Sequence, residues 1–303
     1  MQIEKISLNE QVFTLYIQYQ SDDNLRKEFN KLKNEVWEFD FENYYESGFW
    51  DDNCIIYSLF HDNQIVAHTT VSTLETIAGN EHIVLAQLGM VMTRPDYQKQ
   101  GLSRYLMERI QQDYKEKVNG MFLFANDSVL DFYPKFNFSP VHEFQASAQI
   151  KFSASSHLVT KLNLDDFDQR KLLESYANNS IPTSSLYSKN FGLTFFYCYA
   201  YPDFGFKDAV YYIESLKTIA IAQKEENTLT ILQLFQMEQQ NLDNIIHALA
   251  TPEIDTVVFG FSPLNTDFNY TIHKEEDLTL FVSAELTELF NKQKLMIPLL
   301  SHT

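Results

Sequence analysis

The chain has 303 residues, of which 45% are hydrophobic and 21% charged, the balance of a folded globular protein and not of a disordered one. Its formal net charge of −18 disfavours nucleic acid and anionic membranes as partners. Such a charge mainly keeps a protein soluble, and it mildly favours cationic partners such as amines. The two cysteines lack metal or redox spacing, and no apolar run approaches the ~20 residues that span a bilayer, so we expect a soluble cytoplasmic protein that does not insert into membranes.

The sequence predicts two helices at the start of the chain. Ser7 and Glu10 have the spacing of a capping box, which favours a helix through about residue 18. A second helix is expected to begin at Asp22, where apolar residues recur at helical spacing. Lysines on its other faces, among them Lys33, are expected to face solvent.

The pattern then changes to alternating strands and helices. Strands are predicted at residues 54–60, 65–73, 83–92, 121–125 and after Phe138, with helices from Gly101 and over residues 127–133. This order predicts a mixed α+β layer fold, in which antiparallel hairpins precede one strand–helix–strand crossover.

The small and polar residues 151–156 predict a linker, so we expect domains at residues 1–150 and 157–303. Within the second half, strands are predicted at 209–213, 218–222, 228–235 and 256–260, with a helix over 239–250. This order faintly repeats that of the first half, which indicates a degenerate duplicate.

One predicted strand-to-helix turn has the features of an anion site. Its residues are Gln98, Lys99, Gln100, Gly101, Leu102 and Ser103, followed by Arg104. The start of a helix presents unpaired N–H groups and about half a positive charge, which suits a pyrophosphate. Gly101 allows close backbone approach, and Lys99 and Arg104 are suited to charge-assisted contacts. Taken by itself, the segment fits an ordinary turn equally well.

A second segment follows a short apolar strand. Asn126 at the strand's end is expected to have both amide donors and its acceptor free to hold an amide-bearing ligand. Tyr133, seven residues later, is placed to direct a phenol over the same cleft. The alternatives are that Asn126 or Asp127 caps a helix and that Tyr133 is a core ring.

In this order and spacing, the two segments resemble the GNAT acetyltransferase superfamily. The family's pyrophosphate motif, Gln/Arg-x-x-Gly-x-Gly/Ala, is matched by Gln98, Gly101 and, imperfectly, Ser103. Its second motif, Asn followed by Tyr and then Gly-Phe, is matched by Asn126, Tyr133 and Phe138, with Asn137 in place of Gly. Asn tolerates the left-handed conformation best among non-glycine residues, so the turn is expected to survive. The resemblance covers residues 1–150 and implies the GNAT acyl-CoA N-acyltransferase fold, in tandem if the second half is a duplicate.

The resemblance implies transfer of an acetyl group from acetyl-CoA to a primary amine of a small molecule or peptide, by direct attack in a ternary complex. Tyr133 then corresponds to the general acid that protonates the leaving thiolate. The implied cofactor-binding residues are Val91, Met92 and Thr93 beside the pantetheine, Gln98, Lys99, Gln100, Gly101, Leu102, Ser103 and Arg104 at the pyrophosphate, and Asn126. A non-catalytic acyl-CoA-binding or regulatory module, or a scaffold without cofactor, is the alternative function.

The general base is left open by the sequence. Candidates on or near the strands are His68, Glu75, Glu81 and His82, each of which fits an ordinary surface group as well, and a water relay is an equal alternative. The scattered histidines indicate no metal site. Because the second half lacks the pyrophosphate motif, we expect it to wall the acceptor pocket or to form a dimer contact in a homodimer.

Overall fold

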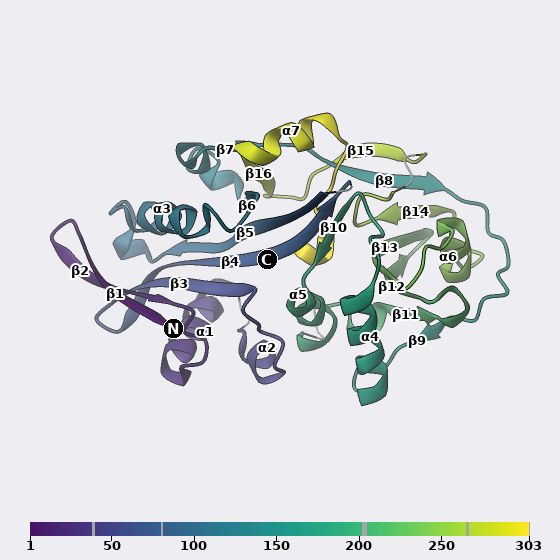
Figure 1. Ribbon diagram of the computed structural model, residues 1–303, viewed down its shortest axis with the longest axis horizontal. Helices are drawn as coiled ribbons and strands as arrows, with labels where there is room; N and C mark the ends of the chain where they lie inside the picture. Colours follow the sequence, from purple (N-terminus) through teal and green to yellow (C-terminus); the bar gives the residue numbers. More distant parts are fainter. Residues whose placement is uncertain (38–39, 80, 202–204, 265–266, 303) are drawn as a thin grey trace.

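The computed structural model of the protein describes residues 1–37, 40–79, 81–201, 205–264 and 267–302, and these residues form two β-sheets that lie side by side (Figure 1). The first sheet consists of β1 (Gln2–Leu8), β2 (Gln11–Ile17), β3 (Cys54–His61), β4 (Gln64–Ala78), β5 (Glu81–Thr93), β6 (Gly120–Ala125), β16 (Thr279–Ser283) and β7 (Phe138–Pro140) in that order, with β10 (Leu186–Lys189) paired to β4. The second sheet consists of β15 (Asn269–His273), β8 (Glu143–Gln149), β14 (Thr256–Phe259), β13 (Thr228–Gln236), β12 (Thr218–Glu225), β11 (Val210–Ile213) and β9 (Thr160–Lys161) in that order. The expected mixed α/β layer architecture is confirmed.

Helices cover both faces of the first sheet. On one face lies α3 (Leu102–Tyr114), and on the other lie α1 (Asp23–Trp37) and α2 (Glu42–Glu46) (Figure 1). The remaining helices are α4 (Phe167–Asn179), α5 (Phe191–Phe195), α6 (Leu242–Leu249) and α7 (Ala284–Lys292). Across the described residues, no helix combines the length and the apolar character that a membrane span requires.

Each face of the first sheet has its own core. Leu106 and Ile110 of α3 are fully buried against Leu88 and Leu123 of the central strands. On the opposite face, α1 packs onto aromatic rings in a second cluster of buried residues that includes Phe29, Phe41 and Trp50. Close packing on both sides fixes the central strands, whose ends carry the candidate site.

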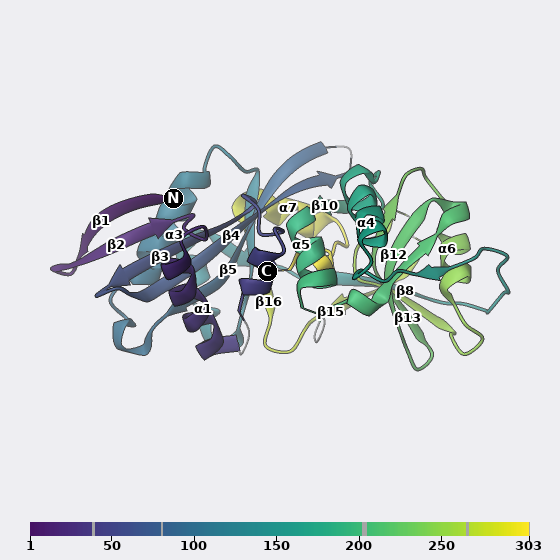
Figure 2. The same ribbon diagram turned by 90° about the horizontal axis from the view of Figure 1, so that it is seen from below.

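The expected helix over residues 7–18 is wrong, because this segment is the β1–β2 hairpin. Asn9 and Glu10 form its tip with φ of 48° and 67°. Phe13, Leu15 and Ile17 of β2 are buried and alternate with more exposed residues, which is the period of a strand. The hairpin extends from one end of the molecule, and the second sheet lies at the other end (Figure 2). Of the two predicted N-terminal helices, only the one at Asp22 is confirmed, as α1.

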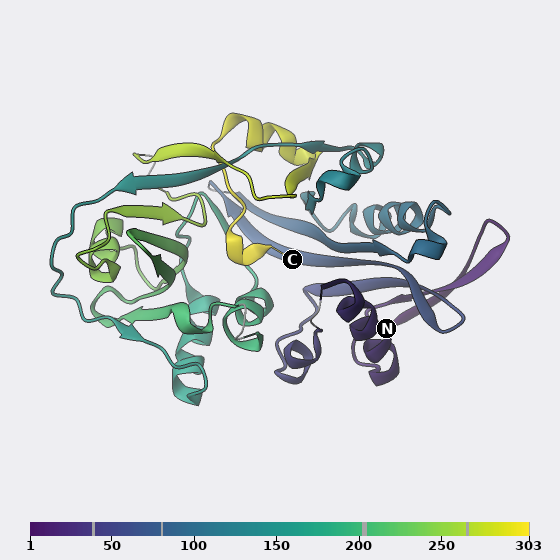
Figure 3. The same ribbon diagram turned by 180° about the vertical axis from the view of Figure 1, so that it is seen from behind.

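The two sheets repeat one strand order. In the first, β5 and β6 are parallel neighbours joined through α3, and in the second, β13 and β14 are parallel neighbours joined through α6. Beside each parallel pair lies an antiparallel strand from the other half of the chain, β16 next to β6 and β8 next to β14. Figure 3 shows the yellow C-terminal strand and α7 beside the blue and teal strands. The repeat favours the predicted duplication.

The predicted division near residue 150 does not coincide with the division between the sheets. The stretch 151–156 has neither helix nor strand, as a linker would. However, β8 before it belongs to the second sheet, and β16 far beyond it belongs to the first. Strand exchange between the halves therefore joins them into one structural unit.

Candidate active site

The candidate site lies where β5 and β6 part. Their parallel pairing runs from Leu85–Gly120 to Leu88–Leu123, although β5 continues to Thr93. The β4–β5 register also shifts opposite this point, and Met90 has a φ of 49°. Such a bulge bends its strand. A cavity of about 670 Å³ opens at this junction.

Six of the residues predicted from the sequence line the cavity. They are Val91, Thr93, Gln98, Ser103, Asn126 and Tyr133. The cavity therefore brings together the end of β5, the start of α3 and Tyr133, the proposed general acid.

The other predicted residues are not among the described residues that line the cavity, namely Met92, Lys99, Gln100, Gly101, Leu102 and Arg104. The Leu102 side chain is 1% exposed and packs in the α3 core. The Gln100 side chain donates to the Asp96 carbonyl at 3.0 Å, and Arg104 pairs with Glu108 at 3.5 Å. Because the side chains of Gln100 and Leu102 are already engaged, these two residues would contact a ligand only through their backbone atoms.

The start of α3 is open to a ligand. Gly101 precedes the helix with a φ of 85°, and no side chain of the described residues caps the first turn. Apart from Gly101 and its two chain neighbours, no described residue has an atom within 4 Å of the position that a Cβ on Gly101 would take. Ser103 Oγ lies 2.5 Å from Thr93 Oγ1 at the cavity wall. Uncapped N–H groups beside a small residue fit a pyrophosphate, so the change from Gly/Ala to Ser103 is compatible with the motif.

Tyr133 is held by aromatic packing at the start of a 3₁₀ turn. Its ring lies 5.2 Å from the Phe132 ring and 5.8 Å from the Phe281 ring of β16. Burial raises the pKa of Tyr133 to about 12, so the phenol is protonated near neutral pH. Asn137 ends the turn with a φ of 63°, which confirms that asparagine replaces glycine in the left-handed position.

Asn126 has a partner that the sequence did not reveal. Its side-chain amide donates to Asp277 Oδ2 at 2.9 Å, and the Asp127 N–H donates to Asp277 Oδ1 at 2.7 Å. The expectation that both Asn126 donors are free for a ligand is wrong, because the chain entering β16 brings Asp277 to the end of β6. The Asp127 N–H is the main cause that holds the pKa of Asp277 below its usual value.

The cavity-lining residues that come from three further regions are mostly aromatic. They are Phe41 and Tyr44 at α2, Leu193 of α5, Phe196 and Tyr197 just after α5, and Leu278 and His302 near the end of the chain. Residues of the second half therefore line the cavity together with residues of the first half.

A family model described as an acetyltransferase (GNAT) domain matches residues 19–141. These residues are a GNAT domain. No curated protein sequence matches the chain.

The fold of the chain is similar to that of many solved structures, among them the two that follow. One is a conserved Enterococcus faecalis protein of unknown function, called a probable N-acyltransferase, with 11% identity and a TM-score of 0.56 over 90% of this chain and 72% of the other. The second is a GCN5-related N-acetyltransferase from Anabaena variabilis, with 13% identity and a TM-score of 0.55 over 88% of this chain and 72% of the other. Both alignments extend over most of the chain and so include the second sheet.

Lys33 of the GNAT domain is a site residue that the sequence analysis missed. It was expected in solvent, but it is 2% exposed and lines the cavity. Its Nζ lies 4.7 Å from the Phe41 ring centroid, and burial lowers the pKa of Lys33 to about 7. The available signal was its position four residues after Phe29, which places both side chains on one helix face.

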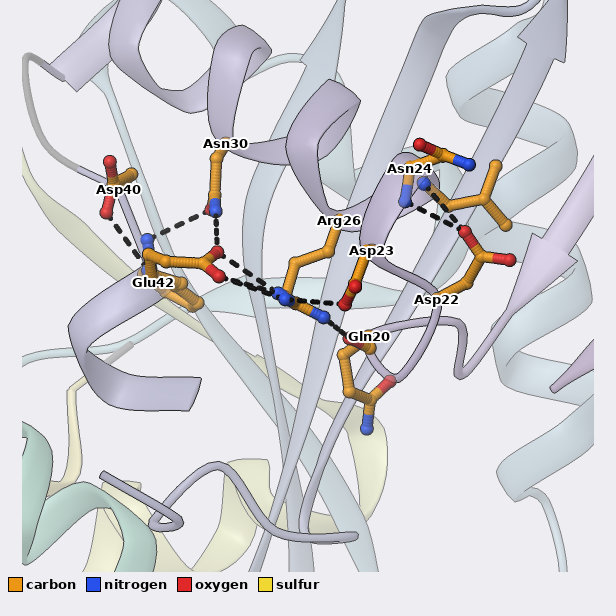
Figure 4. A network of polar contacts seen from close by, with 10 residues as sticks. Gln20, Asp22, Asp23, Asn24, Arg26, Asn30, Asp40 and Glu42 are labelled. Carbon is orange, nitrogen blue, oxygen red and sulfur yellow. Dashed lines mark hydrogen bonds and ion pairs between the residues drawn. The ribbon is translucent and has the colours of Figure 1, made fainter. Parts of the chain in front are cut away.

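A polar network fixes the corner between α1 and α2 that carries Lys33 and Phe41. The Arg26 guanidinium donates to Glu42 Oε1 and Oε2 at 2.9 and 3.0 Å and to the Gln20 carbonyl at 2.8 Å (Figure 4). Asn30 donates to Glu42 at 2.8 Å and accepts from the Phe41 N–H at 3.0 Å. The network thereby ties the cavity wall to α1.

The general bases considered from the sequence do not line the cavity within the described part of the chain. Glu75, Glu81 and His82 are exposed on the distal part of the β4–β5 hairpin. His68 is fully buried behind the wall, with Nε2 3.0 Å from Thr70 Oγ1. Burial lowers the pKa of His68 to about 3, so it is a neutral, hydrogen-bonded core residue.

Proposed function

We propose that the protein is an N-acetyltransferase that moves an acetyl group from acetyl-CoA to a primary amine of a small molecule or peptide. One observation carries the proposal: a single cavity is lined by the unpaired end of β5, the first turn of α3 and the buried phenol of Tyr133. The GNAT domain implies an acyl-CoA donor. We further infer that the transferred acyl group is acetyl and that the acceptor is a primary amine.

The chain's own groups suit each part of acetyl-CoA. The uncapped start of α3 and the Ser103 hydroxyl would hold the pyrophosphate. Residues 89–93 extend past the last β5–β6 pair, so their backbone is available to the amides of the pantetheine arm. Within the described part of the chain, the side-chain amide of Asn126 donates to Asp277. The side-chain oxygen of Asn126 would therefore be the atom that accepts a hydrogen bond from a ligand N–H.

Tyr133 would act as the general acid in direct transfer. A phenol with a pKa of about 12 remains protonated until the departing thiolate forms beside it. A thiol has a pKa of about 8.5, so the phenol binds the thiolate first by a hydrogen bond and passes its proton as the carbon–sulfur bond breaks.

Binding and turnover test the proposal separately. Acetyl-CoA at 100 times its Kd should stabilise the fold by about 2.7 kcal/mol, measured as a thermal shift. Thiol release with a panel of primary amines should reveal turnover, and Tyr133→Phe should lower kcat by about 10²-fold while acetyl-CoA binding is unchanged. An unchanged kcat removes the acid role. Binding without thiol release from any amine would indicate the non-catalytic acyl-CoA-binding module instead.

We further propose that the second half shapes the acceptor pocket and does not bind its own cofactor. At the corresponding junction of the second sheet, Gly260 follows β14, and its carbonyl accepts the Leu299 N–H at 2.8 Å. Leu299 Cδ1 lies 2.9 Å from the position of a Cβ on Gly260. The segment near the chain end therefore packs where the first sheet has its cavity.

A further inference from the structure

The amine acceptor must lose a proton during acetyl transfer, and the cavity wall offers few groups to receive it. No aspartate or glutamate is among the described residues that line the cavity. The ionisable residues that do line it are Lys33, Tyr44, Cys54, Tyr133, Tyr197 and His302. Tyr133 is already assigned to the departing thiolate, so the proton acceptor is sought among the others.

Lys33 enters the cavity from the inner face of α1. Its ammonium faces the Phe41 ring, and the α1–α2 polar network fixes the backbone on both sides of this contact. Among the described residues, the titratable groups that interact with it are Asp40 before α2, Cys54 in β3 and His68 in β4, and Tyr44 in α2 lines the same cavity. Burial outweighs the charge of Asp40 in its effect on Lys33.

We propose that Lys33 is the general base that takes the proton from the acceptor amine, an assignment that rests on the proposed function. The Lys33 Nζ takes one proton from the acceptor ammonium, and the neutral amine nitrogen then forms a bond to the acetyl carbon. As the carbon–sulfur bond breaks, the thiolate receives the Tyr133 proton. The second proton that leaves the nitrogen returns to the Tyr133 phenolate through solvent, and solvent then removes the proton from Lys33.

The chemistry of the cavity favours Lys33 over its neighbours. A base works best when its pKa lies near the working pH, and the pKa of Lys33 is about 7. Burial lowers the pKa of His302 to about 4 and raises that of the Cys54 thiol to about 12, so His302 is a weak base and Cys54 stays protonated. An acceptor ammonium entering the same apolar cavity is desolvated as Lys33 is, which brings the two pKa values together and makes proton transfer nearly balanced.

Two acceptors and three variants test the assignment. An alkylamine, protonated at pH 7, should need the base, whereas a weakly basic amine that is already neutral at pH 7 should need it much less. Lys33→Met should lower kcat/KM for the alkylamine by about 10²-fold or more and for the weakly basic amine by less than about fivefold. Lys33→Arg should behave like Lys33→Met, because guanidinium does not lose its proton. Lys31→Met, on the exposed side of α1, is the matched control and should retain wild-type rates.

The pH profile separates a base from a structural lysine. For the alkylamine, wild-type kcat/KM should rise through about pH 7 and then level off, whereas Lys33→Met should keep rising as the free amine loses its proton. Thermal stability and acetyl-CoA affinity should be unchanged in Lys33→Met. Equal losses with both amines, an unchanged profile, full activity of Lys33→Arg or acetylation of Lys33 itself would overturn the assignment.

The outcome for the wild-type protein distinguishes the two proposals. Turnover that Lys33→Met leaves unchanged overturns only the role of Lys33. Absence of wild-type turnover with every amine overturns the proposed function, and the role of Lys33 with it.

Discussion

Replacing Arg26 with methionine tests whether the α1–α2 corner depends on its polar network. The guanidinium is buried and donates to Glu42, to the Gln20 carbonyl and to Asp23. Methionine keeps much of the apolar stem but leaves the Gln20 carbonyl and one side of Glu42 without these donors. An unsatisfied buried acceptor costs roughly 1–3 kcal/mol, and a hydrogen bond to a charged group contributes a similar amount. Asp23 is 74% exposed and can return to water. We therefore expect a loss of about 3 kcal/mol in the free energy of unfolding.

The sign of the pH dependence follows from Glu42. Its hydrogen bond with Arg26 is the main cause that holds the pKa of Glu42 below the usual 4.5. A carboxyl with a depressed folded-state pKa stabilises the fold fully above its unfolded pKa and loses that contribution as pH falls through the folded value. The difference between wild type and Arg26→Met should therefore be largest near pH 7 and should narrow below about pH 4.

Urea unfolding, followed by circular dichroism at several pH values, measures this difference. Arg104→Met is the control, because the Arg104–Glu108 pair is more than half exposed on both sides and should contribute less than about 1 kcal/mol. The corner also carries Lys33 and Phe41, so Arg26→Met should raise KM for the acceptor more than for acetyl-CoA. Equal losses in the Arg26 and Arg104 variants, or a difference that does not change with pH, would refute the reasoning.

Three further predictions concern the turn and the thiols. Gly101→Ala should destabilise the protein by about 1–2 kcal/mol, because a φ of 85° is left-handed; an unchanged melting temperature would contradict this. Ser103→Val should raise the Kd for CoA at least tenfold, ~1.4 kcal/mol, by crowding the start of α3, while Ser103→Ala should not; calorimetry that finds equal affinities would remove the site. Burial raises the pKa of both Cys54 and Cys198, so neither thiol should react with a thiol reagent until denaturant unfolds the chain.

Local sequence signals predicted the centre of the first sheet. Strands β3 to β6 and helix α3 each have a hydrophobic period that a short window contains. The turn at residues 98–103 and the position of Tyr133 follow from motifs of a few residues. The four strands and the helix predicted for the second half are also present, as β11, β12, β13, β14 and α6, because their segments are short and strongly apolar.

The errors arise where distant contacts decide the structure. The capping-box spacing of Ser7 and Glu10 is also compatible with a hairpin, and the alternating Phe13, Leu15 and Ile17 decide for the strand once they pack on the sheet. Lys33 is polar, but its position on the inner face of α1 buries it. Local helix signals were a weak guide in the first case and side-chain polarity in the second, because tertiary packing overrides both.

Strand exchange had no local signal at all. Pairing of β6 with β16 joins residues more than 150 positions apart, such as Ala125 and Thr279. A one-dimensional pattern shows that a strand exists but not which sheet will accept it. The split at residue 150 followed from the linker composition, whereas the partner of each edge strand depends on the three-dimensional closure of both sheets.

The exchanged strand links the second half to the chemistry proposed for Tyr133. Phe281 of β16 packs 5.8 Å from the Tyr133 ring, and the burial to which it contributes is the cause of the raised pKa of Tyr133. The Ser283 hydroxyl accepts the Met121 N–H at 3.0 Å and so anchors β16 to β6. Asp277, just before β16, holds the turn that follows Asn126. If Tyr133 is the acid, its protonation state depends on a strand from the second half, which makes both halves parts of one catalytic unit.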